Sequence, residues 1–273
     1  MENTKNNFKS IFISKGKKSA SKRSFPLIEI SPLAFVFIFL SIFTNYIKYV
    51  LLLYLIAIIH ELAHILVALF FKRKIRKIRV LPFGLYAIID NIEELSFLKE
   101  NLIYLAGPFS YFLSFLILIL FKNNGMISNY SYLIAQNCNK TMALFNLIPY
   151  YPLDGSKILD TILGRLFLEK KSRIIRIAIS IFFLLLISFF LWKEKQILLI
   201  VYLCSTLIFE IVLFKKKYFN FLIKRLFNKK PQKIKITEKE DIYRYYHTYF
   251  YKDKRMCEEN KIIKKIIGSK DKN

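Results

Sequence analysis

Apolar residues dominate six stretches of the chain, and polar or basic segments separate these stretches. The six run from Pro32 to Tyr46, Tyr49 to Phe71, Leu102 to Phe121, Tyr130 to Pro149, Ile177 to Trp192 and Ile197 to Phe214. An α-helix needs about 20 predominantly apolar residues to cross a bilayer. The pattern therefore predicts an all-α membrane protein with six transmembrane helices.

Lysine and arginine are concentrated in four segments: before the first apolar stretch, and after the second, fourth and sixth. The loops after the first, third and fifth apolar stretches are poor in positive charge: they hold Lys48, then Lys122, then Lys193 and Lys195. Because Lys and Arg accumulate on the cytoplasmic side of a membrane protein, six spans place all four basic segments on that side. We therefore expect a basic cytoplasmic arm over residues 1–25, a six-span core over residues 26–215, and a basic cytoplasmic tail over residues 216–273.

The overall composition excludes an ordinary soluble protein. Of the 273 residues, 55% are hydrophobic, and the formal net charge is +25. The basic arm and the Tyr-rich tail could fit nucleic-acid binding. Positive flanks of membrane spans, and their attraction to anionic lipid, account for the same residues. We expect the lipid bilayer, and no nucleic acid, among the partners.

Two segments outside the apolar stretches carry weaker signals. Residues from Ile75 to Ile89 place β-favouring side chains on both sides of Pro82, Phe83 and Gly84. This pattern favours a small cytoplasmic-side β-hairpin between helices 2 and 3, whose edge could pair with an extended substrate; a plain connecting loop is the alternative. The tail after Lys229 fits either a small helical element at the membrane surface or a partly disordered segment.

The second apolar stretch contains His60-Glu61-Leu62-Ala63-His64. Helix positions four residues apart share one face, so the imidazoles of His60 and His64 can converge on one metal ion. Glu61 is placed to contact a water molecule on that ion. Ionisable side chains inside an apolar span are costly and are usually functional. The alternative is two structural histidines with Glu61 as their counter-ion.

A catalytic zinc site needs a third protein ligand and one open position. The fourth apolar stretch runs into an irregular segment, because Pro149 and Pro152 forbid a regular helix there. Asp154 follows on this segment and can direct a carboxylate at the metal, and Gly155 relieves crowding behind it. The alternative for Asp154 and Gly155 is an ordinary interfacial turn.

Both motifs resemble those of the site-2 proteases, a family of intramembrane zinc metalloproteases. Asn146 to Gly155 reads Asn-Leu-Ile-Pro-Tyr-Tyr-Pro-Leu-Asp-Gly, which matches the second signature of that family. The resemblance implies one Zn²⁺ per chain, bound by His60, His64 and Asp154. It implies catalytic roles for Glu61, as the base, and for Asn146, as a group that holds the substrate or its oxyanion.

Within this family the chain is most similar to the sporulation proteases of spore-forming bacteria. That similarity implies a membrane-associated pro-sigma factor, pro-sigma-K, as substrate, and inhibitory membrane proteins as partners. It also implies a place in the outer forespore membrane with the termini in the mother cell. The stretch after Asn228 is too short for the CBS domain of well-known members, so none is expected here. Two alternatives stay open: a site-2 protease that cuts an anti-sigma factor or signal-peptide remnants, and a non-proteolytic zinc-binding membrane protein.

Overall fold

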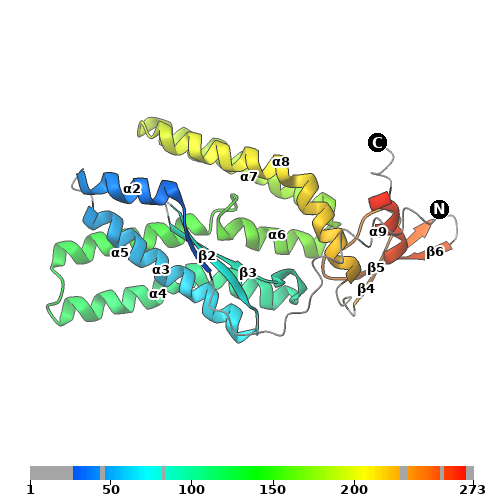
Figure 1. The fold of residues 1–273 in the computed structure, drawn as a ribbon, viewed down its shortest axis with the longest axis horizontal. Coiled ribbons are helices and arrows are strands. Elements are labelled where there is room, and N and C mark those ends of the chain that lie inside the picture. Colours follow the sequence, from blue (N-terminus) through cyan, green and yellow to red (C-terminus); the bar gives the residue numbers. More distant parts are fainter. Residues whose placement is uncertain are drawn as a thin grey trace.

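The computed structural model describes residues 27–43, 47–81, 84–227, 231, 233–252 and 255–268, and the following account concerns these. The expected basic arm, residues 1–25, lies outside the described part, as do Pro82 and Phe83 at the centre of the expected hairpin. Figure 1 shows helices running roughly side by side, with a small sheet beside α3 and a second small sheet near the C-terminus.

Helices make up most of the described chain. They are α2 (Pro32–Phe43), α3 (Ile47–Phe70), α4 (Phe97–Asn123), α5 (Asn129–Asn146), α6 (Asp154–Leu166), α7 (Glu169–Lys193), α8 (Ile197–Phe227) and α9 (Glu259–Gly268), with a short 3₁₀ turn η1 (Ile92–Glu94) before α4. Three of the described helices, α3, α4 and α7, are long and apolar enough to cross a membrane. They coincide with the second, third and fifth predicted spans.

The other three predicted spans correspond to helices of a different character. Helix α2 is apolar but has only 12 described residues. Helix α5 carries Gln136, Asn137, Asn139 and Lys140 among its apolar residues, which lowers its hydropathy. Helix α8 has 31 residues and ends in a basic segment. The structure therefore supports three spanning helices by length and composition.

The first sheet lies against α3 and combines three strands. Strands β2 (Ile75–Leu81) and β3 (Gly84–Ile89) pair antiparallel where the sequence favours a hairpin. Strand β1 (Leu27–Ile30), which precedes the first apolar helix, adds parallel to β2. The strand order β1-β2-β3 leaves β3 at an edge of this sheet, and β3 packs against α3.

The tail differs from its prediction, because it holds a second sheet. Strands β4 (Ile234–Thr237), β5 (His247–Lys252) and β6 (Arg255–Glu258) form this sheet, and α9 packs against β5 and β6. We call β4, β5, β6 and α9 the C-terminal unit. A buried apolar cluster joins the unit to the end of α8, and its members are Tyr218, Phe221, Leu222, Ile242 and Ile263. The fold is therefore mostly helical with two small sheets, and "all-α" was too narrow a prediction.

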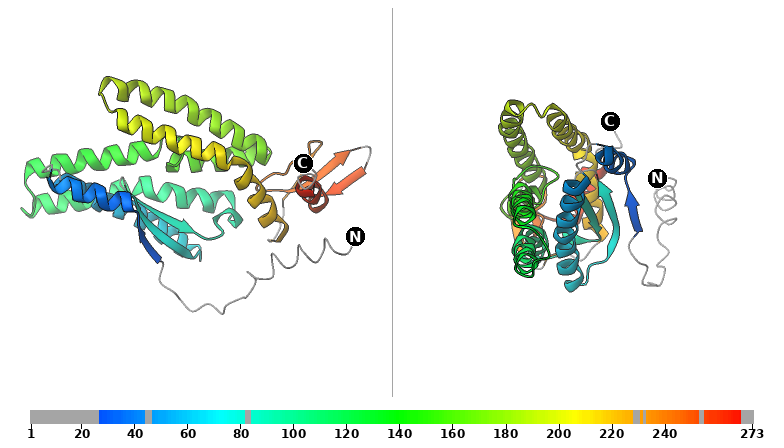
Figure 2. Two further views of the ribbon diagram at one scale, coloured as in Figure 1. Left: turned by 45° about the horizontal axis from the view of Figure 1, so that its top comes forward. Right: turned by 90° about the vertical axis from the view of Figure 1, so that its left-hand side faces the viewer.

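Helix α4 lies at the centre of the helical bundle. It packs against α3, α5 and α6, and the α7–α8 pair continues from α6. Figure 2 shows α7 and α8 on one flank of the bundle and the C-terminal unit at one end of it. This arrangement brings the middle of α3, the first half of α4 and the start of α6 together.

Candidate metal centre

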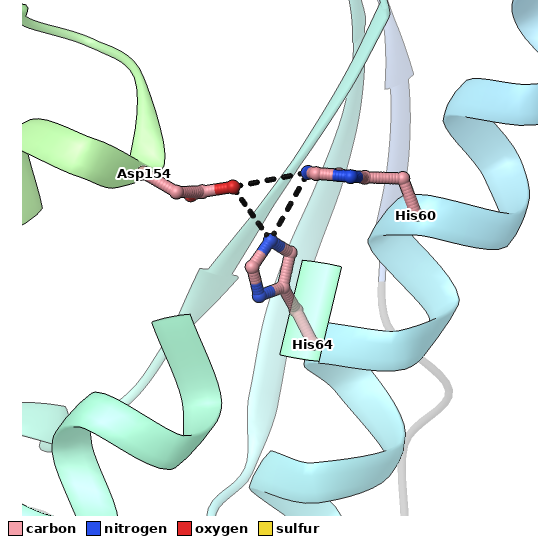
Figure 3. Close-up of side chains that lie close together, drawn as sticks. All are labelled: His60, His64 and Asp154. Atoms are coloured by element: carbon pink, nitrogen blue, oxygen red, sulfur yellow. Dashed lines mark hydrogen bonds and ion pairs between the residues drawn. The ribbon is translucent and has the colours of Figure 1, made fainter. Parts of the chain in front are cut away.

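His60 and His64 lie one turn apart on α3 and turn their rings toward the start of α6 (Figure 3). The two Nε2 atoms are 3.3 Å apart. Each Nε2 atom lies 3.0 Å from Oδ2 of Asp154, the first residue of α6. His64 and Asp154 are buried, and His60 is half-buried. The three residues named from the sequence therefore meet at one point.

The irregular segment before α6 sets the position of Asp154. Tyr150, in its middle, is fully buried, and its hydroxyl contacts the Leu203 carbonyl and the Thr206 hydroxyl on α8. At the other end, a Cβ on Gly155 would lie 2.1 Å from the Leu147 carbonyl oxygen, which no side chain can tolerate. The segment thus folds back tightly against the first turn of α6, as the Asp154-Gly155 pair suggested.

The three donor atoms fit a tetrahedral zinc ion. Zinc binds His nitrogen and carboxylate oxygen at about 2.0–2.1 Å, so the ligand atoms of a tetrahedral site lie about 3.3 Å from one another. The observed separations of 3.0, 3.0 and 3.3 Å are close to that value. Two imidazoles and one carboxylate also form the donor set of a catalytic zinc, which keeps a fourth position open.

Contacts behind the ligands fix their orientation. Nδ1 of His64 lies 2.6 Å from the Ile103 carbonyl on α4. A carbonyl only accepts hydrogen bonds, so Nδ1 carries the proton, and a neutral His64 points the Nε2 lone pair at Asp154. Lone pairs and a carboxylate that face one another repel unless protons or a metal cation lie between them. The arrangement is therefore suited to a cation.

The second oxygen of Asp154 is also held. Lys157, one turn further along α6, donates from Nζ to Oδ1 of Asp154 at 2.8 Å. Burial raises the pKa of the Asp154 carboxyl, whereas the neighbouring ammonium of Lys157 lowers it, and the resulting pKa lies well below its usual range. Asp154 is thus a carboxylate at neutral pH, with Oδ2 left to face the histidines.

Gly107 on α4 leaves room for the two imidazole rings because it has no side chain. A Cβ on this residue would lie 2.2 Å from Nε2 of His64 and 2.6 Å from Nε2 of His60. Helix α4 therefore approaches the candidate site so closely that only a glycine fits. The sequence shows Ala106-Gly107-Pro108 inside an apolar stretch, but nothing in that pattern gives its distance from the histidines.

Glu61 is buried beside the site, with 8% of its surface exposed. Its Oε1 accepts a hydrogen bond of 2.6 Å from the backbone N–H of Ala87 on β3. The carboxylate is thus held between α3 and the edge strand of the first sheet. The link from β3 to Glu61 was not predicted, because it depends on how the sheet packs on α3.

Asn146 occupies the last position of α5. Its side-chain amide donates to the Met142 carbonyl, one turn back, at 3.0 Å. Within the described residues no contact joins Asn146 to His60, His64 or Asp154. It nevertheless immediately precedes Leu147, whose carbonyl is in close contact with Gly155. The structure therefore places Asn146 near the start of α6 without showing a role for its side chain.

Comparison with models of known protein families gives no match. Among curated proteins, Stage IV sporulation protein FB of Bacillus subtilis is 26% identical over 161 residues, which cover 59% of this chain and 56% of the relative. Zinc metalloprotease MJ0392 of Methanocaldococcus jannaschii is 35% identical over 136 residues, 48% of this chain and 39% of the relative. The chain thus spans about half the length of these relatives or less.

A solved structure is similar to this chain in its fold as well. The site-2 protease from Methanocaldococcus jannaschii matches with a TM-score of 0.53 and 29% identity, over 69% of this chain and 93% of the matched chain. The relatives are named as a sporulation protein and a zinc metalloprotease, and the matched fold is that of a site-2 protease. Together with the triangle of His60, His64 and Asp154, these likenesses support placing the chain in the site-2 protease family.

Proposed function

We propose that this protein is an intramembrane zinc metalloendopeptidase that hydrolyses peptide bonds of membrane-associated proteins. One observation carries the proposal: three zinc-type donor atoms lie 3.0–3.3 Å apart, with Glu61 next to His60 on the same helix. His60, His64 and Asp154 would hold one Zn²⁺. Zinc held there would supply a Lewis acid for a water molecule and for the scissile carbonyl.

Glu61 is the proposed general base. Its carboxylate would take a proton from the attacking water and return it to the leaving amine. The Ala87 N–H, at 2.6 Å from Oε1, keeps this carboxylate in place before substrate arrives. Asn146 is the proposed second donor to the tetrahedral oxyanion. That role requires its amide to leave the Met142 carbonyl and turn toward the site.

The edge of β3 is the proposed binding site for an extended substrate. The N–H of Ala87 points away from β2 and toward Glu61. Backbone groups of alternate residues in a strand face the same way, so Leu85 and Ile89 present theirs along this edge. A peptide that added to β3 as a further strand would run past Glu61, which brings its backbone to the base.

The substrate proposed is pro-sigma-K, processed during sporulation. The sporulation protein of Bacillus subtilis supports this choice through its 26% identity to the chain. The accompanying proposals are six spans, both termini cytoplasmic, a core over residues 26–215 and a basic tail over residues 216–273. They also include inhibitory membrane partners and, in a sporulating cell, a location in the outer forespore membrane.

Co-expression with tagged pro-sigma-K tests the proposal. Wild type should shorten the substrate, and Glu61→Gln should leave it intact while the protein accumulates normally. Leu62→Ala is the matched control, because Leu62 follows Glu61 on the same helix but its side chain is exposed, and it should cleave as wild type does. Cleavage of an anti-sigma factor or a signal-peptide remnant, but not of pro-sigma-K, would show that pro-sigma-K is not the substrate and that the enzyme acts on another class of membrane protein. Cleavage by Glu61→Gln would contradict the mechanism.

A further inference from the structure

A second site lies away from the metal centre, where the C-terminal unit meets the end of the bundle. A cavity of about 840 Å³ opens there. Its walls come from the segment before α4, the first turn of α4, the ends of α6 and α8, and the stretches on either side of β4. In Figure 1 this is the region where the end of α8 approaches β4 and β5.

The cavity is strongly basic. Seven of its lining residues are Lys or Arg, and two are Glu. The two glutamates are already paired: Glu94 with Arg73 at 3.0 Å, and Glu93 with Lys224 at 3.4 Å.

Three of the cations have no such partner. No carboxylate of the described chain lies within 4 Å of the Lys99, Arg165 or Lys233 side chains. Lys99 and Arg165 lie instead over aromatic rings, those of Phe71 and Phe97. Three uncompensated positive charges around one cavity attract an anion.

Hydrogen-bond donors at the cavity also lack acceptors. The Nε atoms of Arg73 and Arg244 are buried and have no partner among the described residues. Both residues line the cavity, and the Arg244 side chain is only 6% exposed. In addition, the side chain of Ser96 does not cap α4, and Ser96 and the first residues of α4 line the cavity. Phosphate oxygens suit such a combination of guanidinium and helix N-terminal donors.

The position of the cavity points to a lipid. It lies where α3 has just ended and α4 begins, which are two of the helices long and apolar enough to span a membrane. Exposed apolar side chains surround this end of the two helices: Phe70 at 80%, Leu98 at 69% and Leu102 at 53%. Acyl chains could lie on these side chains while the headgroup enters the cavity. Basic pockets at the ends of membrane helices bind anionic headgroups.

We propose that this cavity binds the phosphate-bearing headgroup of an anionic phospholipid, with Lys99, Arg165 and Lys233 as its principal cations. The site joins the bundle to the C-terminal unit, so the lipid would hold the two together. This inference is independent of the metal centre and of proteolysis, and its test needs neither.

Native mass spectrometry of the full chain in detergent, titrated with dioleoyl-phosphatidylglycerol or dioleoyl-phosphatidylcholine, tests the proposal. Wild type should bind phosphatidylglycerol in preference to phosphatidylcholine. The triple variant Lys99→Gln, Arg165→Gln, Lys233→Gln should bind phosphatidylglycerol roughly 100-fold more weakly, since each lost charge weakens binding about fivefold. The matched control Lys216→Gln, Lys261→Gln, Lys264→Gln removes the same charge from exposed positions outside the cavity and should bind as wild type does.

A charge-conserving variant guards against a folding defect. Lys99→Arg, Arg165→Lys, Lys233→Arg should retain phosphatidylglycerol binding, and all variants should unfold near the wild-type temperature without added lipid. Equal phosphatidylglycerol affinity of the Gln triple variant and wild type would overturn the proposal, as would equal affinity for the two lipids. Binding of inorganic phosphate alone as tightly as phosphatidylglycerol would show that the ligand is a soluble phosphate and would overturn the lipid assignment.

Discussion

At the scale of single residues, Gly107 is the position where α4 lies against both histidines of the candidate site. Its Cα faces both imidazoles, and an added Cβ would lie 2.2 Å from His64 Nε2. We predict that Gly107→Ala displaces His60 and His64 and weakens zinc binding at least tenfold, because overpacking forces neighbouring side chains out of place. Competition with a zinc chelator would measure this change.

Phe109→Ala is the control for that prediction. Phe109 lies two residues further along α4 with 59% of its surface exposed, so its loss should leave zinc affinity unchanged. Equal zinc affinity of Gly107→Ala and wild type would mean that α4 does not approach the ligands this closely.

Lys157 supports Asp154 from the side away from the histidines. The Nζ to Oδ1 contact of 2.8 Å leaves the other carboxylate oxygen free for the metal. Removing such a supporting contact typically lowers metal affinity by about 10-fold to 100-fold. We predict a loss of this size for Lys157→Met and a partial recovery for Lys157→Arg. The same chelator competition measures it, and unchanged affinity in Lys157→Met would rule out the supporting role.

The sequence points to the candidate ligands of this site more directly than to the residues around them. His60, His64 and Asp154 follow from helix spacing and from a broken segment, and the structure brings them together as predicted. The Ile103 carbonyl could not be predicted, because every residue has a backbone carbonyl and only packing selects one. The roles of Gly107 and Lys157 could not be predicted for the same reason, because they depend on how the helices pack against one another.

At the scale of elements, Arg244 connects the C-terminal unit to the bundle. It forms ion pairs with Glu100 on α4 at 2.7 Å and with Asp160 on α6 at 2.6 Å. Helix α4 carries Ile103 and Gly107, and α6 begins with Asp154. The tail thus holds the two helices that complete the site around α3.

We predict that Arg244→Met destabilises this junction by about 3–5 kcal/mol, because it leaves the fully buried Glu100 without its cation. Adding Glu100→Gln should recover part of the loss, since no unpaired charge remains. Thermal unfolding in detergent would measure stability, and hydrogen exchange over residues 234–268 would report the docking of the C-terminal unit.

Lys265→Met is the comparison for Arg244→Met. It breaks an ion pair with Glu240 in which both side chains are well exposed, so the loss should stay within about 1 kcal/mol. Equal stability of Arg244→Met and Lys265→Met would show that the Arg244 junction does not hold the unit in place.

Elements were predictable in proportion to their length. Long apolar helices such as α3, α4 and α7 follow directly from hydropathy. The short strands β4 to β6 do not, because each has four to six residues and lies among lysines that mask its pattern. Their pairing also depends on the buried cluster at the end of α8, which joins residues distant in sequence. Strand β1 was not predicted either, because its partner β2 lies 50 residues away in the sequence.

At the scale of the whole molecule, the basic segments make a prediction about topology. With six spans, reporters fused after Phe227 or inserted next to Asp90 should lie in the cytoplasm, and reporters in the α4–α5 or α7–α8 connections should lie on the opposite side. Fusions to alkaline phosphatase and to a fluorescent protein would distinguish the two sides. A cytoplasmic reporter in the α4–α5 connection would contradict the six-span arrangement.

The central claim is that three residues hold zinc and a fourth performs proton transfer. Zinc content of the purified protein tests it most directly, measured on wild type, Glu61→Gln, His64→Ala and Asp154→Asn. We predict about one zinc ion per chain in wild type and in Glu61→Gln, and almost none in His64→Ala and Asp154→Asn. Loss of zinc from Glu61→Gln, or full zinc in Asp154→Asn, would contradict the assignment of these residues.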